Sequence, residues 1–432
     1  MHGMTVRVHG TCAPGFEGVR AELERSFAER GELGAAVAAT VGGELVVDLW
    51  GGDADRDGTR PWERDTLVNV YSTTKGMTAL CAHLLVDRGE LDLDAPVARY
   101  WPEFAAAGKA DIPVRWLLSH RAGLIAPGEP MAPGAVYDWE EVTEALAATR
   151  PWWRPGTAQG YHAVTFGFLV GEVVRRITGV SLGTFLRTEV TGPLGADVHV
   201  GTPESEHGRC ADMAPPVSRE APGTREAARA REAPGAREAP PASPSHSSSS
   251  SRTVFGDVPK PPVAGLSDHP MAPATLALQY LPLGDVNAAA YRCAEIPAAN
   301  GHATARGIAA VYAELACGRL LSPGAVERLR TCQGDGDEPD LVLRVGTPLA
   351  ETWPWGLGYM LNQYGQAGPN PRAFGHGGAG GSYAFADPEN GVSYAYTMNR
   401  MGAGTSGEDL RSVHLVGALY QGLRERGPVQ GR

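Results

Sequence analysis

The stretch VNVYSTTKGMTALCAHLL, residues 68–85, decides the fold and raises a question about its lysine. The chain has three lysines, Lys75, Lys109 and Lys260, against 35 arginines. Arg cannot lose its proton in a protein, whereas a desolvated Lys can become a neutral amine and act as a base. Ser72 precedes Lys75 by three residues, so both side chains lie on one face if the segment is helical. The stretch is therefore either a nucleophile with its base or merely an exposed helix start.

Two later stretches carry further candidate residues. In PGTAQGYHAVTFG, Tyr161 leads an expected helix after a Pro-Gly turn, and a buried phenol beside a lysine can relay a proton to a leaving group. The alternative is a core tyrosine with a satisfied hydroxyl. In FGHGGAGGSYAFAD, His376 precedes Gly377 and Gly378, whose small size lets a backbone approach a ligand and hold an oxyanion. The alternative there is a plain glycine turn.

The hydrophobic pattern around these stretches predicts strands at both ends of the chain and helices between them. Because such end strands commonly share one sheet, we expect the termini to build one unit. The expected helices are 17–30, from the STTK segment to about 86, 139–149, 164–179, 304–318 and one within 408–424. The expected strands are a hairpin of 34–41 and 44–52, a strand-like 355–363, and a hairpin within 381–400 that turns at 387–391.

These elements predict a discontinuous α/β domain, residues 15–94 and 300–428, and a mainly helical domain, residues 95–299, with the active site at their junction. Residues 214–263 contain an Arg-Glu-Ala-Pro-Gly repeat and a Ser run with few large apolar side chains. Such a stretch cannot bury enough surface to offset its ordering entropy. We expect a disordered insertion within the helical domain and interpret it as a tolerated loop expansion, with a docking tail as the alternative.

Composition excludes several function classes. The net charge of −11 gives no electrostatic reason to expect a nucleic-acid or anionic-membrane partner. No stretch approaches 18 uninterrupted apolar residues, and the first residues lack the basic and apolar regions of a signal peptide. The six cysteines have neither CxxC nor metal-ligand spacing, which predicts reduced thiols. We expect a cytoplasmic protein without metal or cofactor, and the oligomeric state stays open.

The order STTK (72–75), Tyr161 and HGG (376–378) resembles the serine β-lactamase and penicillin-binding-protein superfamily. It is most similar to the β-lactamase-like carboxylesterases known as family VIII esterases. LSHRAGL (118–124) is similar to the Leu-Leu-Ser-His-x-x-Gly segment of that family, and the likeness covers nearly the whole chain outside the insertion. The resemblance implies a mixed α/β (α+β) fold: five or more antiparallel strands flanked by helices, plus an all-α domain.

Residue by residue, the resemblance implies Ser72 as the acylated nucleophile and Lys75 as its base. Tyr161 would protonate the leaving group or help to activate water. His376 stands where β-lactamases usually carry Lys and could hydrogen-bond the Tyr161 hydroxyl. The N–H groups of Ser72 and Ala379 would form the oxyanion hole, beside Gly377 and Gly378.

Two departures from the β-lactamase pattern bear on the substrate. Related β-lactamases usually have Tyr-x-Asn, but Ala163 stands at the third position here, and His376 replaces a lysine. Because His is mostly neutral near pH 7, both changes weaken recognition of an anionic, peptide-like substrate. We therefore expect a serine hydrolase that cleaves carboxylic esters. An acyltransferase or peptide cyclase/amidase of the same fold, and a non-catalytic ligand-binding relative, stay open.

Two other motifs are decoys. GVSLG (179–183) matches the α/β-hydrolase nucleophile elbow, but the preceding segment is helical where that motif needs a strand. We interpret Ser181 as a helix N-cap. GHGGAG (375–380) matches a dinucleotide fingerprint, but an expected strand follows it instead of a helix. His83 and His120 are interpreted as structural.

Overall fold

The structure, a computed structural model, describes residues 6–216, 273–334, 340–343, 354–402 and 409–426. Its largest element is a seven-stranded sheet in which every neighbouring pair is antiparallel. In spatial order the strands are β1 (Val8–Cys12), β3 (Glu44–Gly52), β2 (Gly34–Val41), β10 (Val392–Met398), β9 (Tyr383–Asp387), β8 (Phe374–Gly377) and β7 (Met360–Leu361). The pairing of β2 with β10 confirms that both ends of the chain share one sheet.

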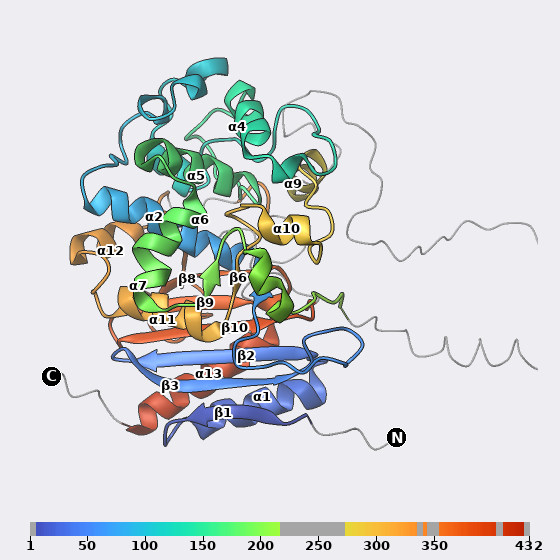
Figure 1. Ribbon diagram of the computed structural model, residues 1–432. Coiled ribbons are helices and arrows are strands. Elements are labelled where there is room, and N and C mark those ends of the chain that lie inside the picture. Colours follow the sequence, from blue (N-terminus) through green and yellow to red (C-terminus); the bar gives the residue numbers. More distant parts are fainter. Residues whose placement is uncertain (1–5, 217–272, 335–339, 344–353, 403–408, 427–432) are drawn as a thin grey trace, which may run out of the picture.

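Helices cover both faces of this sheet (Figure 1). Successive residues of a strand point to opposite faces, and β10 shows where each face packs. Ser393 donates from its hydroxyl to the carbonyl of Ala309 in α11 (Ala305–Ala316). The next residue, Tyr394, points to the other face, where its hydroxyl oxygen lies 3.4 Å from the hydroxyl oxygen of Ser412 in α13 (Leu410–Arg426). Helix α1 (Glu17–Glu29) packs against α13 on this second face, which explains why β10 is buried at every residue.

The helical part of the molecule lies on the α11 side of the sheet (Figure 1). Its centre is α2 (Thr74–Asp87), in which every residue from Thr74 to Leu85 is buried. A helix that is buried on all sides needs neighbours on all sides, and α2 contacts α5, α6, α12 and β8. The remaining helices are α3 (Val114–Leu118), α4 (Trp139–Ala148), α5 (Thr165–Thr178), α6 (Leu182–Leu186), α7 (Gly192–Leu194), α9 (Pro273–Tyr280), α10 (Ala289–Cys293) and α12 (Pro323–Leu329).

Several elements differ from expectation. The strand β1 and a small sheet of β4 (Val68–Asn69), β6 (His302–Ala303) and β5 (Val198–His199) were not predicted. The expected strand at 355–363 is reduced to β7, because Gly358 has φ +86° and interrupts an extended backbone. Helix α5 begins at Thr165, so Tyr161 lies before the helix rather than at its start. The expected insertion lies outside the described residues, except for 214–216.

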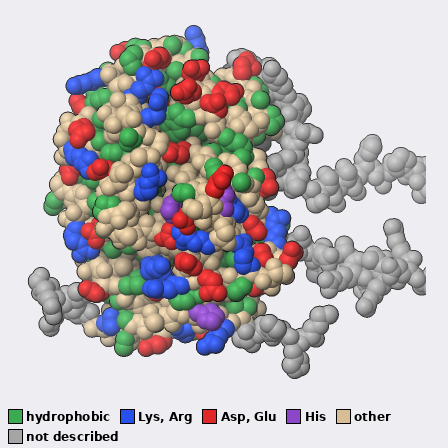
Figure 2. Space-filling view, viewed as in Figure 1, with side chains coloured by type: hydrophobic (Ala, Val, Ile, Leu, Met, Phe, Trp, Pro, Cys, Tyr) green, Lys and Arg blue, Asp and Glu red, His purple; other side chains and the backbone are tan. Residues whose placement is uncertain are grey.

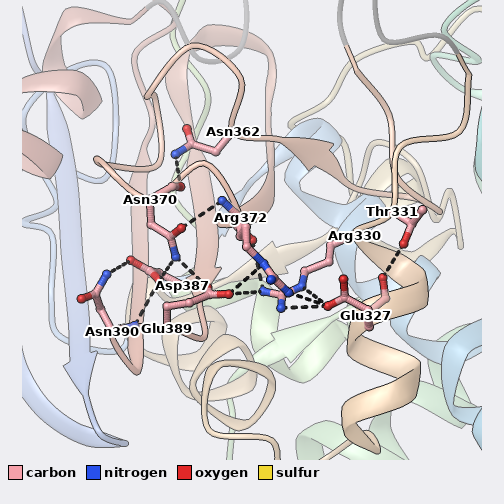
Figure 3. A network of polar contacts seen from close by, with 9 residues as sticks. All are labelled: Glu327, Arg330, Thr331, Asn362, Asn370, Arg372, Asp387, Glu389 and Asn390. Atoms are coloured by element: carbon pink, nitrogen blue, oxygen red, sulfur yellow. Dashed lines mark hydrogen bonds and ion pairs between the residues drawn. The ribbon is translucent and has the colours of Figure 1, made fainter.

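The end of the β9–β10 hairpin is tied to α12 by charged side chains (Figure 3). Arg330 and Arg372 both pair with Glu327 of α12 and with Glu389 of the hairpin turn. Charged side chains of both signs are interspersed over the face drawn in Figure 2. Within the described ranges, no helix has the length and apolar character needed to cross a bilayer.

Candidate active site

Ser72 sits in a strained turn at the entrance to α2. A 3₁₀ turn, Tyr71–Thr73, precedes the helix, and Tyr71 has the left-handed φ of 45° that a bulky residue rarely adopts. The side chain of Asn69 holds this conformation by accepting the Tyr71 N–H at 3.1 Å. Strain of this kind persists only where the surroundings enforce it, and it gathers at functional sites. The turn leaves Ser72 partly exposed at the N-terminal end of a buried helix.

Lys75 is fully buried beneath Ser72. Its Nζ lies 2.7 Å from the carbonyl oxygen of Ala163, 2.9 Å from that of Ala298, and 3.0 Å from Ser72 Oγ. Burial lowers the Lys75 pKa well below 10.5. A neutral amine has two N–H groups and one lone pair, and this environment satisfies all three. An ammonium donates to all three oxygens, whereas a neutral amine donates to the two carbonyls and can accept the proton of the Ser72 hydroxyl with its lone pair.

Lys109 provides an internal comparison, because it is also fully buried and also has three oxygen neighbours. Its Nζ donates to the carbonyls of Ala106 at 2.9 Å, Ala147 at 2.8 Å and Thr149 at 2.5 Å. Carbonyls only accept, so this environment satisfies the three N–H groups of an ammonium and gives a neutral amine nothing for its lone pair. Burial lowers the Lys109 pKa to about 8. The two buried lysines therefore differ: the Lys75 site satisfies the amine in both protonation states, as a base requires, and the Lys109 site satisfies only a cation, which ties a loop to the end of α4.

Tyr161 lies against both Lys75 and Ser72. Its ring centroid is 4.7 Å from Lys75 Nζ, and its ring stacks on Trp355 at 5.4 Å and meets the edge of His120 at 5.0 Å. Burial raises the Tyr161 pKa well above 10, and a hydrogen bond with Ser72 offsets this only in part. The phenol therefore keeps its proton at neutral pH and can donate it.

His376 is buried and neutral. Burial, followed by the nearby charge of Lys75, lowers its pKa to about 3. Its ring centroid is 6.1 Å from that of Tyr161, and its Nδ1 lies 2.7 Å from the Gly377 carbonyl, which fixes the proton on Nδ1. Among the described residues Nε2 has no hydrogen-bond partner. The expected hydrogen bond from the Tyr161 hydroxyl to His376 is therefore not formed.

The glycine turn after β8 packs directly on the turn that carries Ser72. A Cβ added at Gly378 would lie 2.1 Å from Ser382 Oγ and 2.3 Å from the carbonyl oxygen of Val70. The Ser382 hydroxyl in turn donates to Val70 O at 2.8 Å. Ala379 then begins a 3₁₀ turn, Ala379–Gly381, and the first N–H groups of such turns lack a partner within the turn. Ser72 and Ala379 thus lie in two turns that pack together, each with an N–H group near the turn's start.

Comparisons with known proteins agree with this arrangement. The profile of the family described as "Beta-lactamase" matches residues 19–418. The chain belongs to the beta-lactamase family. It is 36% identical over 403 residues to the esterase/beta-lactamase LipL of Mycobacterium tuberculosis, which covers 91% of this chain and 83% of LipL.

Two solved structures of the family have the same fold and are also similar in sequence. A family VIII carboxylesterase aligns with 38% identity and a TM-score of 0.79, over 96% of this chain and 100% of that one. A penicillin-binding-protein homologue from Caulobacter crescentus aligns with 38% identity and a TM-score of 0.78, over the same shares. The expected serine β-lactamase-like fold is confirmed.

The structure brings the sequence-predicted site residues together on two turns and one loop. Ser72 and Lys75 lie at the start of α2, Tyr161 on the loop before α5, and the HGG segment at the end of β8. Ser181, by contrast, accepts the Thr184 N–H as the N-cap of α6, which confirms its structural interpretation. The assignment of catalytic roles to these residues stays a prediction.

Three supporting side chains were missed. Asp340 is buried and accepts the N–H of Tyr161 at 3.0 Å and the indole N–H of Trp355 at 3.3 Å, so it fixes the loop and the wall around the phenol. Trp355 was assigned to a strand. His120 was interpreted as structural, and its φ of 59° and its contacts with the Tyr161 and Trp355 rings place it in the site wall. The motif LSHRAGL was the available signal for His120, whereas Asp340 stands among other acidic residues and gave none.

Proposed function

We propose that this protein is a serine hydrolase, a carboxylesterase that works through an acyl-enzyme on Ser72. The observation that carries the proposal is the environment of Lys75, whose Nζ lies 3.0 Å from Ser72 Oγ and has two carbonyls as its other partners, so that a neutral amine keeps its lone pair for the Ser72 proton. A serine hydroxyl becomes an effective nucleophile when such a base takes its proton. Names of the relatives, an esterase/beta-lactamase and a family VIII carboxylesterase, support the same reaction class.

In the proposed reaction, Lys75 Nζ takes the Ser72 proton as Oγ attacks the ester carbonyl. The N–H groups of Ser72 and Ala379 bind the oxygen as it becomes negative. When the carbon–oxygen bond of the ester breaks, Tyr161 gives its proton to the departing alkoxide and recovers one from the Lys75 ammonium. Water then repeats these steps in reverse order on the acyl-enzyme and releases the acid.

The charge state of the site supports a neutral substrate. His376 stands where the related β-lactamases usually carry a lysine, and its pKa of about 3 keeps it uncharged. It therefore offers no positive charge to a substrate carboxylate. An ester without a charged group next to the scissile bond is the substrate class that this environment favours.

The test is the intact mass of the wild type after exposure to p-nitrophenyl butyrate, with product release followed in parallel. An acyl adduct and turnover that are both absent from Ser72→Ala would support the proposal. Turnover that survives in Ser72→Ala would refute the nucleophile assignment. An adduct without turnover would favour the non-catalytic relative, and adduct decay that accelerates with an added alcohol or amine would favour acyl transfer.

A further inference from the structure

The turn that carries the proposed oxyanion donor is itself hydrogen-bonded through its peptide groups. The N–H of Ala379 and the carbonyl of Gly378 belong to one peptide group. That carbonyl accepts the N–H of Gly381 at 3.2 Å. A donor at the carbonyl end of a peptide withdraws electron density from the N–H at its other end and makes that N–H a stronger donor.

The same arrangement repeats one peptide further along. The N–H of Gly381 shares its peptide group with the carbonyl of Gly380. This carbonyl accepts two hydrogen bonds, one from Nη2 of Arg411 at 2.7 Å and one from the N–H of Gly402 at 2.8 Å. Two peptide groups in series therefore connect the Arg411 guanidinium to the Ala379 N–H.

The guanidinium of Arg411 is held so that all its donors are used. Its Nε donates to Oδ1 of Asp409 at 2.9 Å, and the second N–H of its Nη2 donates to Oδ2 of Asp409 at 2.6 Å. Its Nη1 donates to Glu32 and to the carbonyl of Arg400, both at 3.0 Å. With Gly380 O as the fifth acceptor, the five N–H groups of the guanidinium are all satisfied. The side chain is 5% exposed, so solvent screens this charge little.

The turn fits tightly against this cluster. A Cβ added at Gly381 would lie 2.5 Å from Asp409 Oδ2 and 2.9 Å from Arg411 Nη2, and one at Gly380 would lie 2.5 Å from Met401 Sδ. Buried ion clusters add little net stability compared with apolar packing. Stability alone therefore gives a weak reason for two carboxylates and a guanidinium at this place in the fold.

We propose that Arg411 is a positioning residue of the oxyanion hole. Its guanidinium fixes the Gly380 carbonyl and, through the two peptide groups, aims and strengthens the Ala379 N–H as a donor to the developing oxyanion. This inference rests on the proposed function, because it needs an acyl-enzyme on Ser72. It adds to that function an electrostatic contribution from a side chain that does not touch the substrate.

The test uses Arg411→Met and Arg411→Lys, with Arg175→Met as the matched control. Arg175 pairs with the buried Glu172 of α5, so its loss also breaks an ion pair of a buried carboxylate, but outside the turn. Each variant is titrated with a phosphonate ester to count functional sites. Per titrated site, we expect kcat/KM with p-nitrophenyl butyrate to fall on the order of tenfold in Arg411→Met, mainly through kcat, and less in Arg411→Lys.

The infrared band of the acyl carbonyl is the readout that a merely structural role would not move. In Arg411→Met it is expected at higher frequency than in the wild type, because the carbonyl accepts a weaker hydrogen bond, and the Arg175→Met band should not move. If Arg411→Met does not fold, Asp409→Asn, which loosens the hold on Nη2, should show the same shift to a smaller degree.

The inference would be overturned if both the infrared band and kcat/KM per titrated site were unchanged in the Arg411 variants. The same holds for Asp409→Asn where that variant replaces them. Either result would leave the proposed function intact. Failure of the wild type to form any adduct on Ser72 would overturn both.

Discussion

Replacing each of the two buried lysines by methionine should produce opposite results. In Lys75→Met the base is lost, while an apolar side chain of similar length replaces an amine whose pKa burial lowers well below 10.5. General-base catalysis typically contributes about 10²–10⁴-fold, so kcat/KM should fall by that factor. Two carbonyls lose their hydrogen-bond donor, which destabilises the fold, but the cost of burying a polar amine is removed. The two effects oppose each other, so the free energy of unfolding should change by no more than about 2 kcal/mol.

In Lys109→Met the order of the effects is reversed. Three carbonyls lose a charged donor at once. Hydrogen bonds from charged groups are worth about 1.5–3 kcal/mol each, and relief from burying the amine offsets part of that loss. We expect a destabilisation of about 2–4 kcal/mol, with kcat per titrated site within about twofold of the wild type.

The assay combines urea unfolding with p-nitrophenyl butyrate turnover, each rate normalised by phosphonate titration or, where titration fails, by folded protein from circular dichroism. A third variant, Lys75→Arg, separates charge from basicity, because Arg keeps the cation but cannot give up its proton. It should be as inactive as Lys75→Met. Full activity in Lys75→Arg, or equal losses of activity in the Lys75 and Lys109 methionine variants, would refute the assignment of the base from its hydrogen-bond partners.

Three further predictions follow from the same geometry. Gly378→Ala should lower kcat/KM by at least about tenfold, because its Cβ would lie 2.3 Å from the Val70 carbonyl; near-normal turnover would show that the turn adapts. The rise of kcat/KM with pH should level off well below pH 10.5, since the Lys75 pKa is lowered; a rate that still climbs at pH 10.5 would contradict this. The free energy of unfolding from urea titrations should fall as pH drops from about 6.5 towards 3, because folding lowers the pKa of His302 and His376 to about 3, so the unfolded chain binds more protons; constant stability over that range would be the contrary result.

The fold was accessible from the sequence because its decisive elements are locally encoded. The hairpin of β2 and β3 turns at Gly42 and Gly43, both of which adopt positive φ, as two-residue hairpin turns require. The helix expected from the STTK segment to about residue 86 is present as α2, although its complete burial was not predicted. By contrast, β7 and the strands of the small sheet have two residues each, and in the small sheet β4 and β5 pair with β6, which lies far away in the chain. No local pattern encodes such strands.

The side chains of the candidate site could be predicted, but the atoms that set their chemistry could not. Lys75 and Lys109 both stand among apolar and small residues in the sequence. Only Lys75 was predicted to be functional from the sequence, because a serine precedes it by three residues. What separates them physically is the third partner of each Nζ, a hydroxyl at Lys75 and a carbonyl at Lys109.

The other partners of Lys75 are backbone carbonyls contributed by Ala163 and Ala298, from loops 88 and 223 residues away. Any residue type supplies a carbonyl, so the identity of these positions carries no sign of their role. The same holds for the Gly380 carbonyl, which links Arg411 to the oxyanion turn. The side chains of this site can thus be recognised by motif, while main-chain groups decide the protonation state of Lys75 and the strength of the Ala379 N–H as a donor. Substitutions that move these loops without changing Ser72 or Lys75 should therefore alter the rate of acylation as strongly as substitutions within the motif.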